Sequence, residues 1–104
     1  MIEKKLILPD RVRKIPAGFG WTDRRFLHDG HLASLDSPAI LLYYFLTTVG
    51  DVQGLSFWAD PRVSTLLKLP LGQVVGSRDR LVEHDLIAFR HPIYQVLSLP
   101  EVRA

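Results

Sequence analysis

Hydrophobic and polar residues recur at helical spacing in the centre of the chain. In residues 37–49 one apolar stripe is formed by Ala39, Leu42, Tyr43 and Leu46, and most of a second by Leu41, Tyr44, Phe45 and Thr48. Asp36-Ser37-Pro38 precedes them, with Ser37 as the expected N-cap and Pro38 at the first helical position. Because a helix that is apolar on two sides must be covered on both, either residues 1–35 or a second subunit should cover Leu41 and Tyr44.

Two further helices are predicted downstream, separated by a tight turn. Asp60-Pro61 again places a capping residue before a proline, which predicts the start of a second helix. This helix is expected to end at the turn Lys68-Leu69. Pro70 suits the first turn of the next helix, which we place at residues 70–84. Its inward side is predicted to hold Val74, Ser77 or Arg78, and Leu81.

Short runs of strand-forming residues surround these helices. Residues 55–58 follow a glycine-containing turn and read as one short strand. Residues 86–90 and 94–99 are two more candidate strands, joined by a short connection at His91-Pro92-Ile93. The predicted order is therefore helix, strand, helix, helix and hairpin.

The first 35 residues lack such periodicity until a short helix near Phe26. Leu6-Ile7-Leu8 is a candidate edge strand in an extended arm that we expect to lie on the domain surface. The expected anchors of this region are Trp21, Phe26 and Leu27. Thr22 or Asp23 is expected to cap one or two helical turns that stop near Asp29-Gly30. We thus divide the chain into a basic arm and short helix packing on the domain (1–35), a domain (36–100) and a tail (101–104).

From Ser37 to Leu99 the chain resembles a winged helix-turn-helix domain. It is similar to the type found at the N-terminus of phage, plasmid and primosomal replication-initiation proteins, and in related bacterial regulators. The resemblance is carried by four segments, SPAILLYYFL, DVQGLSFW, DPRVSTLLKL and RLVEHDLI. It implies a mainly α fold with a small antiparallel sheet, in which helix 70–84 is the recognition helix. Lys68 and Asp85 stand where such domains usually carry glycine.

The composition excludes several classes of protein. Of the 104 residues, 47% are hydrophobic and 23% are charged, which fits one packed domain. The absence of cysteine excludes disulfides and thiolate metal sites. The longest apolar run, 39–46, is far short of the ~20 residues that span a bilayer. With no signal-peptide pattern at the N-terminus, we expect a cytoplasmic protein.

Motifs for catalysis or for a metal are not found in the sequence. His28 and His31 lie close together, but no second group of ligands accompanies them, so we interpret them as surface residues. We find no nucleophile elbow, no phosphate-binding loop and no carboxylate pair with a partner base. The expectation is a protein without enzymatic activity, without a cofactor and without a metal.

Charge is distributed unevenly along the chain. Residues 1–31 hold seven Lys or Arg against four Asp or Glu, whereas residues 32–104 hold six against seven. The basic third can track phosphates, and it can equally be a solvated face. The wing tip adds Arg90, which can reach phosphate or the minor groove, while His91 fits a solvated turn.

Helix 70–84 has a mixed outer face. Gln73 can pair with adenine, Arg78 or Arg80 can reach phosphate or guanine, and Gly72 and Gly76 leave room for close approach. Asp79 and Glu83 oppose phosphate, and Leu71 and Val75 are apolar. The main hypothesis is a winged-helix protein that binds double-stranded DNA in transcription control, replication or mobile-element functions. Its predicted contacts are Gln73, Gly76, Arg78, Arg80, Arg62, Lys68, Arg90, Lys4, Lys5, Arg11, Arg13 and Lys14.

The alternative hypothesis is a protein-interaction module, a dimerisation or adaptor domain. Its interface would include Leu71, Val75, Leu41 and Tyr44. Two glycines four residues apart suit close packing of a partner helix as well as close approach to DNA. The partner would be a second copy of the chain or another protein.

Overall fold

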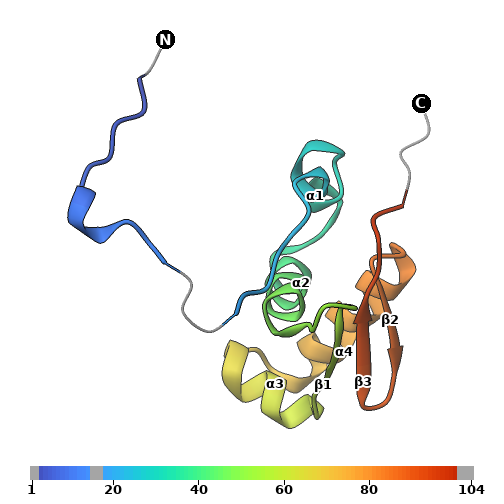
Figure 1. Ribbon diagram of the computed structural model, residues 1–104. Coiled ribbons are helices and arrows are strands. Elements are labelled where there is room, and N and C mark those ends of the chain that lie inside the picture. Colours follow the sequence, from blue (N-terminus) through green and yellow to red (C-terminus); the bar gives the residue numbers. More distant parts are fainter. Residues whose placement is uncertain (1–2, 15–17, 101–104) are drawn as a thin grey trace.

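Two helices of equal length and a small sheet form the centre of the structure, a computed structural model that describes residues 3–14 and 18–100 (Figure 1). The helices are α1 (Arg25–His28), α2 (Ser37–Val49), α3 (Asp60–Leu67) and α4 (Leu71–Glu83). The strands are β1 (Leu55–Phe57), β2 (Ile87–Arg90) and β3 (Ile93–Val96). Single 3-10 turns lie at Pro9–Arg11 and Leu32–Ser34. The mainly helical fold with a small antiparallel sheet is confirmed.

The three strands form an antiparallel sheet in the order β1-β3-β2. Tyr94, on the central strand β3, lies opposite Ser56 of β1 and Phe89 of β2. Its side chain is fully buried, so the hairpin of β2 and β3 is fastened to the core at this position. The observed strands are shorter than the predicted runs because Leu86 and residues 97–99 continue as irregular chain.

The core lies where α2 packs on α4. The first predicted stripe of α2 is buried in full, and so are the inward residues of α4, Val74, Ser77 and Leu81. Phe26 stacks on Tyr43 with 4.2 Å between ring centroids, and thereby covers one side of α2. The second stripe is covered only in part, because Leu41 and Tyr44 remain 41% exposed.

Helix starts and turns depart from the sequence predictions in two respects. Asp36, rather than Ser37, caps α2, because its carboxylate accepts from the backbone N–H of Ala39 at 3.1 Å. Asp60 does not cap α3; it is the first residue of that helix, and its carboxylate binds Arg78 instead. Lys68 and Asp85, at the expected glycine positions, both adopt the left-handed conformation, with φ of 56° and 61°.

The N-terminal region divides into a packed part and a projecting part. Gly20 lies so close to the end of α2 that an added Cβ would overlap the carbonyl oxygen of Thr47. Thr22 and Thr47 are hydrogen-bonded through their hydroxyl oxygens at 2.8 Å. Phe26 is buried as predicted, but the anchor prediction is wrong for Trp21 and Leu27, which are exposed.

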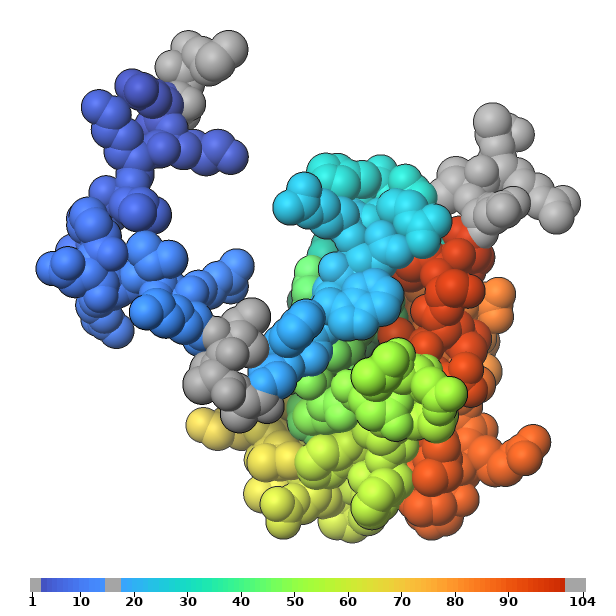
Figure 2. Space-filling view, in the orientation of Figure 1, coloured from blue at the N-terminus to red at the C-terminus, as the bar shows by residue number. Residues whose placement is uncertain are grey.

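Residues 3–14, called the arm from here on, project from the domain. Every residue of the arm is exposed, and Figures 1 and 2 show it standing apart on the side away from the hairpin. The prediction that the arm lies on the domain surface is therefore wrong. Leu6-Ile7-Leu8 forms no strand in this structure, because no other strand lies beside it. Residues 1–2, 15–17 and the predicted tail 101–104 lie outside the described residues.

A glycine at the start of β1 gives a prediction about stability. Gly54 has φ +81°, and an added Cβ would lie 2.6 Å from the carbonyl oxygen of Val96. Gly30 has φ +83° with no atom near its Cβ position, so it suffers the same backbone strain without the contact. We expect Gly30→Ala to cost about 1 kcal/mol of unfolding free energy and Gly54→Ala about 2–3 kcal/mol. Urea denaturation checks this, and equal losses would contradict the contact with β3.

Candidate nucleic-acid interface

The outward face of α4 is the surface to which the sequence assigned DNA contacts. Leu71, Gly72, Gln73, Asp79, Arg80 and Glu83 are exposed there, and Val75 and Gly76 are half-buried. Val74, Ser77 and Leu81 are buried and define the side of α4 that faces the core. The exposed residues lie on the other sides of the helix. Gln73 lies in the first turn of α4 and is exposed to solvent.

The two glycines of α4 have no packing function within the described chain. A Cβ at Gly72 would meet no atom within 4 Å, and one at Gly76 would meet only the Arg80 guanidinium at 3.8 Å. Glycine inside a helix costs ~1 kcal/mol relative to alanine, and no contact among residues 3–14 and 18–100 explains that cost. The glycines therefore leave a shallow, open strip along the outer side of α4.

Arg78 is not available for the DNA contact predicted for it. Its side chain is only 12% exposed, and its guanidinium binds the Asp60 carboxylate at 2.5 Å and the Tyr94 hydroxyl at 3.2 Å. The guanidinium also lies over the Phe89 ring at 4.2 Å from its centroid. Arg78 thus ties α4 to the start of α3 and to the hairpin, and the assignment to DNA is corrected.

The charges in this cluster stabilise one another. Burial of Arg78 disfavours its charge, but the hydrogen bonds to Asp60 and Tyr94 outweigh burial and raise its pKa above the ordinary value. For Tyr94 the effect of burial is the opposite: it raises the pKa of the hydroxyl, although the hydrogen bond from Arg78 works against this rise. At neutral pH the cluster consequently holds a charged arginine and a neutral tyrosine.

Arg80 is partly occupied by a partner that the sequence did not indicate. Its guanidinium lies 3.0 Å from the carboxylate of Asp36, and both side chains are about half exposed. The pair links α4 to the start of α2. Because exposed ion pairs are weak, Arg80 can exchange Asp36 for a phosphate, and it stays a candidate contact.

Three cations around α3, α4 and the hairpin are outside the ion pairs found in the described residues. Arg62 is exposed on α3, Lys68 is exposed in the turn before α4, and Arg90 is exposed at the tip of the hairpin. The salt bridges of residues 18–100 engage other arginines, Arg25, Arg78 and Arg80. Arg62 and the hairpin residues Pro92 and Ile93 line one groove, which shows that α3 and the hairpin tip are neighbours.

The basic residues of the arm are all exposed but lie apart from these cations. Lys4, Lys5, Arg11, Arg13 and Lys14 face solvent, with Lys5 3.9 Å from Glu3. Because the arm stands on the side away from the hairpin, it does not extend the positive surface around Arg90 (Figure 1). The two groups of cations form separate surfaces in this conformation.

The residues assigned to a protein interface remain partly open. Leu71 is 49% exposed at the start of α4, whereas Val75 is half-buried rather than fully exposed. Leu41 and Tyr44 lie on α2, with Tyr44 meeting Phe26 edge to face at 5.8 Å between centroids. The α4 pair and the α2 pair are thus on different helices, and α1 covers part of the second.

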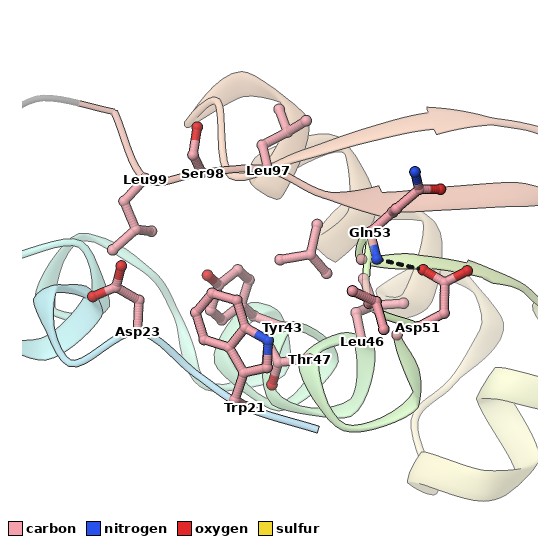
Figure 3. A pocket seen from close by; sticks show the side chains of 14 residues that line it. Trp21, Asp23, Tyr43, Leu46, Thr47, Asp51, Gln53, Leu97, Ser98 and Leu99 are labelled. Carbon is pink, nitrogen blue, oxygen red and sulfur yellow. Dashed lines mark hydrogen bonds between the residues drawn. The ribbon is translucent and has the colours of Figure 1, made fainter. Parts of the chain in front are cut away.

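A cavity of about 250 Å³ lies between residues 21–23, the end of α2, the loop 50–54 and residues 96–99. Figure 3 shows Trp21, Tyr43 and Leu46 among the side chains that line it. Both carboxylates at its border are engaged, since Asp23 binds Arg25 and Asp51 accepts from the N–H groups of Gln53 and Leu55. Burial raises the pKa of Tyr43 to about 12, so its hydroxyl stays neutral. We interpret this cavity as a packing gap where residues 18–24 lie against the rest of the domain.

Neither a membrane span nor a group of metal ligands is found within residues 3–14 and 18–100. No helix there is both long and apolar enough to cross a bilayer. No three His, Asp or Glu residues of the described chain gather at ligand distance, and His28 and His31 have no third partner.

No protein-family model, no curated protein and no solved structure matches the chain.

Proposed function

We propose that the chain is a winged-helix protein that binds double-stranded DNA through α4. In this interpretation α3 and α4 form the helix-turn-helix, and the β2–β3 hairpin is the wing. The observation that carries the proposal is the strip at Gly72 and Gly76, where an added Cβ would meet no described atom at Gly72 and only the Arg80 guanidinium at Gly76. A helix whose outer side lacks side-chain bulk can approach a groove closely.

The polar residues around that strip support the same function. Gln73 would read a base edge in the major groove, and Lys68 would meet phosphate at the turn before α4. Arg62 and Arg90 would contact the DNA phosphates across the major groove from Lys68, because α3 and the hairpin tip are neighbours. Arg80 would join them after leaving Asp36. The arm would add phosphate contacts outside the central site, in transcription control or in the replication or movement of a mobile element.

The salt dependence of binding tests the roles of the three unpaired cations. Each cation that meets a phosphate releases counterions, so replacing it lowers the slope of log Kd against log salt by about 1. We expect Arg62→Ala, Lys68→Ala and Arg90→Ala each to have this effect in fluorescence-anisotropy titrations with a duplex. Arg24→Ala is the matched control, since Arg24 is exposed but lies beside α1. A slope change in the control alone would contradict the proposed orientation.

A protein-interaction module is the second candidate function. The specific observation is that apolar side chains are exposed on two helices, Leu71 on α4 and Leu41 and Tyr44 on α2, which a protein partner would cover and DNA would not. The negative charges of Asp79 and Glu83 also suit a basic protein partner. Absence of DNA binding at low salt, together with a stably folded protein, would favour this candidate over the first.

A further inference from the structure

The arm exposes more apolar surface than a DNA-binding segment requires. Leu6, Ile7 and Leu8 are 66%, 92% and 60% exposed, and they lie between Lys4-Lys5 and the basic residues 11–14. Phosphate contacts need only the flanking cations. Three consecutive large apolar side chains in a segment that stands apart from its own domain favour a protein surface that covers them (Figure 1).

An open apolar groove is present on the same molecule. It runs beside β1, between the end of α2, the start of α3 and the hairpin tip. Its lining is Val49, Asp51, Leu55, Ser56, Phe57, Trp58, Ala59, Arg62, Pro92 and Ile93. Phe57 is 72% exposed and Ile93 is 42% exposed, so the groove has room for additional apolar side chains.

The groove also contains an unpaired strand edge. β1 is at an edge of the sheet. On either side of it the N–H of Val96 donates to the carbonyl of Gly54, and the N–H of Trp58 donates to the carbonyl of Pro92. Because antiparallel bonds alternate along a strand, the N–H and C=O of Phe57 point to the open side. The corresponding groups of Leu55 are taken by Asp51, so Phe57 is where another strand can pair with β1.

We propose that Leu6-Ile7-Leu8 of one copy docks in this groove of a second copy, with Ile7 opposite Phe57. The arm would add a short strand to β1, and reciprocal exchange of two arms would form a two-fold dimer. The charged residues that line the groove are one acid, Asp51, and one arginine, Arg62, so the apolar side chains and the strand edge, rather than charge, would hold the arm. The Lys and Arg residues on either side of Leu6-Ile7-Leu8 would stay at the surface of the dimer. The docking itself uses only apolar and backbone contacts, so the proposal does not depend on DNA binding.

The absence of cysteine permits a direct cross-linking test. Two residues opposite each other in an antiparallel pair have Cα atoms ≈ 5.5 Å apart, within the range of a disulfide. We expect a mixture of Ile7→Cys and Phe57→Cys chains to form a mixed disulfide under mild oxidation. The control mixture replaces Phe57→Cys with Val52→Cys, because Val52 is fully exposed but does not line the groove. Docking raises the local thiol concentration, so the first mixture should react about tenfold faster.

The outcomes separate docking between copies from its alternatives. Equal rates in the two mixtures would overturn the proposal. A chain carrying both cysteines should form disulfide-linked dimers; an internal disulfide in a monomer would show that the arm folds onto its own groove and would also overturn it. Sedimentation gives a test without cysteines: wild type should contain dimer that Ile7→Asp loses, and a wild type that is monomeric at every concentration contradicts the exchange.

Discussion

Replacing Arg78 with alanine is expected to lower the free energy of unfolding by about 3 kcal/mol. Its guanidinium holds together Asp60, Tyr94 and the face of Phe89, with only 12% of the side chain exposed. Removal leaves the Asp60 carboxylate, itself about one-quarter exposed, without its partner. Three elements, α3, α4 and the hairpin, meet at this cluster, so the variant should unfold at lower urea concentration in a single transition.

Arg80→Ala is the matched control for that prediction. Arg80 is two residues further along α4 and also binds an aspartate, but its pair with Asp36 is about half exposed. Exposed pairs contribute less than about 1 kcal/mol, so this variant should unfold close to wild type. Removing Asp60 and Arg78 together should cost less than the sum of the single losses, because no unpaired charge remains. Equal losses for Arg78→Ala and Arg80→Ala would show that the buried cluster does not hold the hairpin.

The second large effect is expected at Gly76, and it concerns binding instead of stability. Gly76→Glu places a negative side chain on the open strip of α4, where the proposed function places DNA. The helix should tolerate the change, since glutamate is a good helix former and Arg80 follows four residues later. Affinity for a duplex should fall by about tenfold or more, because the added side chain fills the strip and repels phosphate.

Leu27→Glu separates a local effect from a general change in charge. Leu27 is exposed on α1, and this variant adds the same negative charge away from α4. We expect its affinity to change much less than that of Gly76→Glu in parallel anisotropy titrations, with melting temperatures measured for both. Equal affinities of the two variants would place the DNA on another surface. A folded Gly76→Glu protein that binds as tightly as wild type would exclude α4 as the contact.

The helices and the order of the elements were predictable from the sequence because local signals set them. Proline near the start of α2 and of α3, and apolar spacing within α2 and α4, place each helix within a residue or two. The left-handed conformations at Lys68 and Asp85 fall where the resemblance expects glycine. These features depend on neighbours in sequence, so single-sequence reasoning finds them.

The features that were missed depend on contacts between distant residues. Helical spacing left Ser77 and Arg78 as alternatives on the inner side of α4, and both proved to face inward. An arginine can do so here only because Asp60, Tyr94 and Phe89 surround it, and nothing local to Arg78 indicates them. The pairing of Arg80 with Asp36 is of the same kind. An acid at the start of α3 was a weak signal for a partner, since it was equally well explained as a cap.

The surface of β1 was missed for a different reason. The exposed side chain of Phe57 sits in an apolar run, LSFW, which predicts a strand but not which side the sheet leaves open. Whether an edge is free depends on strand order, and β3 rather than β2 pairs with β1. The groove and the arm that we propose to fill it therefore emerge only from the assembled fold.

The most direct test of the central proposal is an anisotropy titration of the wild-type protein with duplex DNA at low and at moderate salt. Winged-helix binding through α4 and the neighbouring cations predicts saturable binding that is tightest at low salt and weakens steadily as salt rises. Gly76→Glu, measured in the same series, should bind more weakly at every salt concentration. Absence of wild-type binding at low salt, by a protein whose circular dichroism shows it folded, would contradict the proposed function.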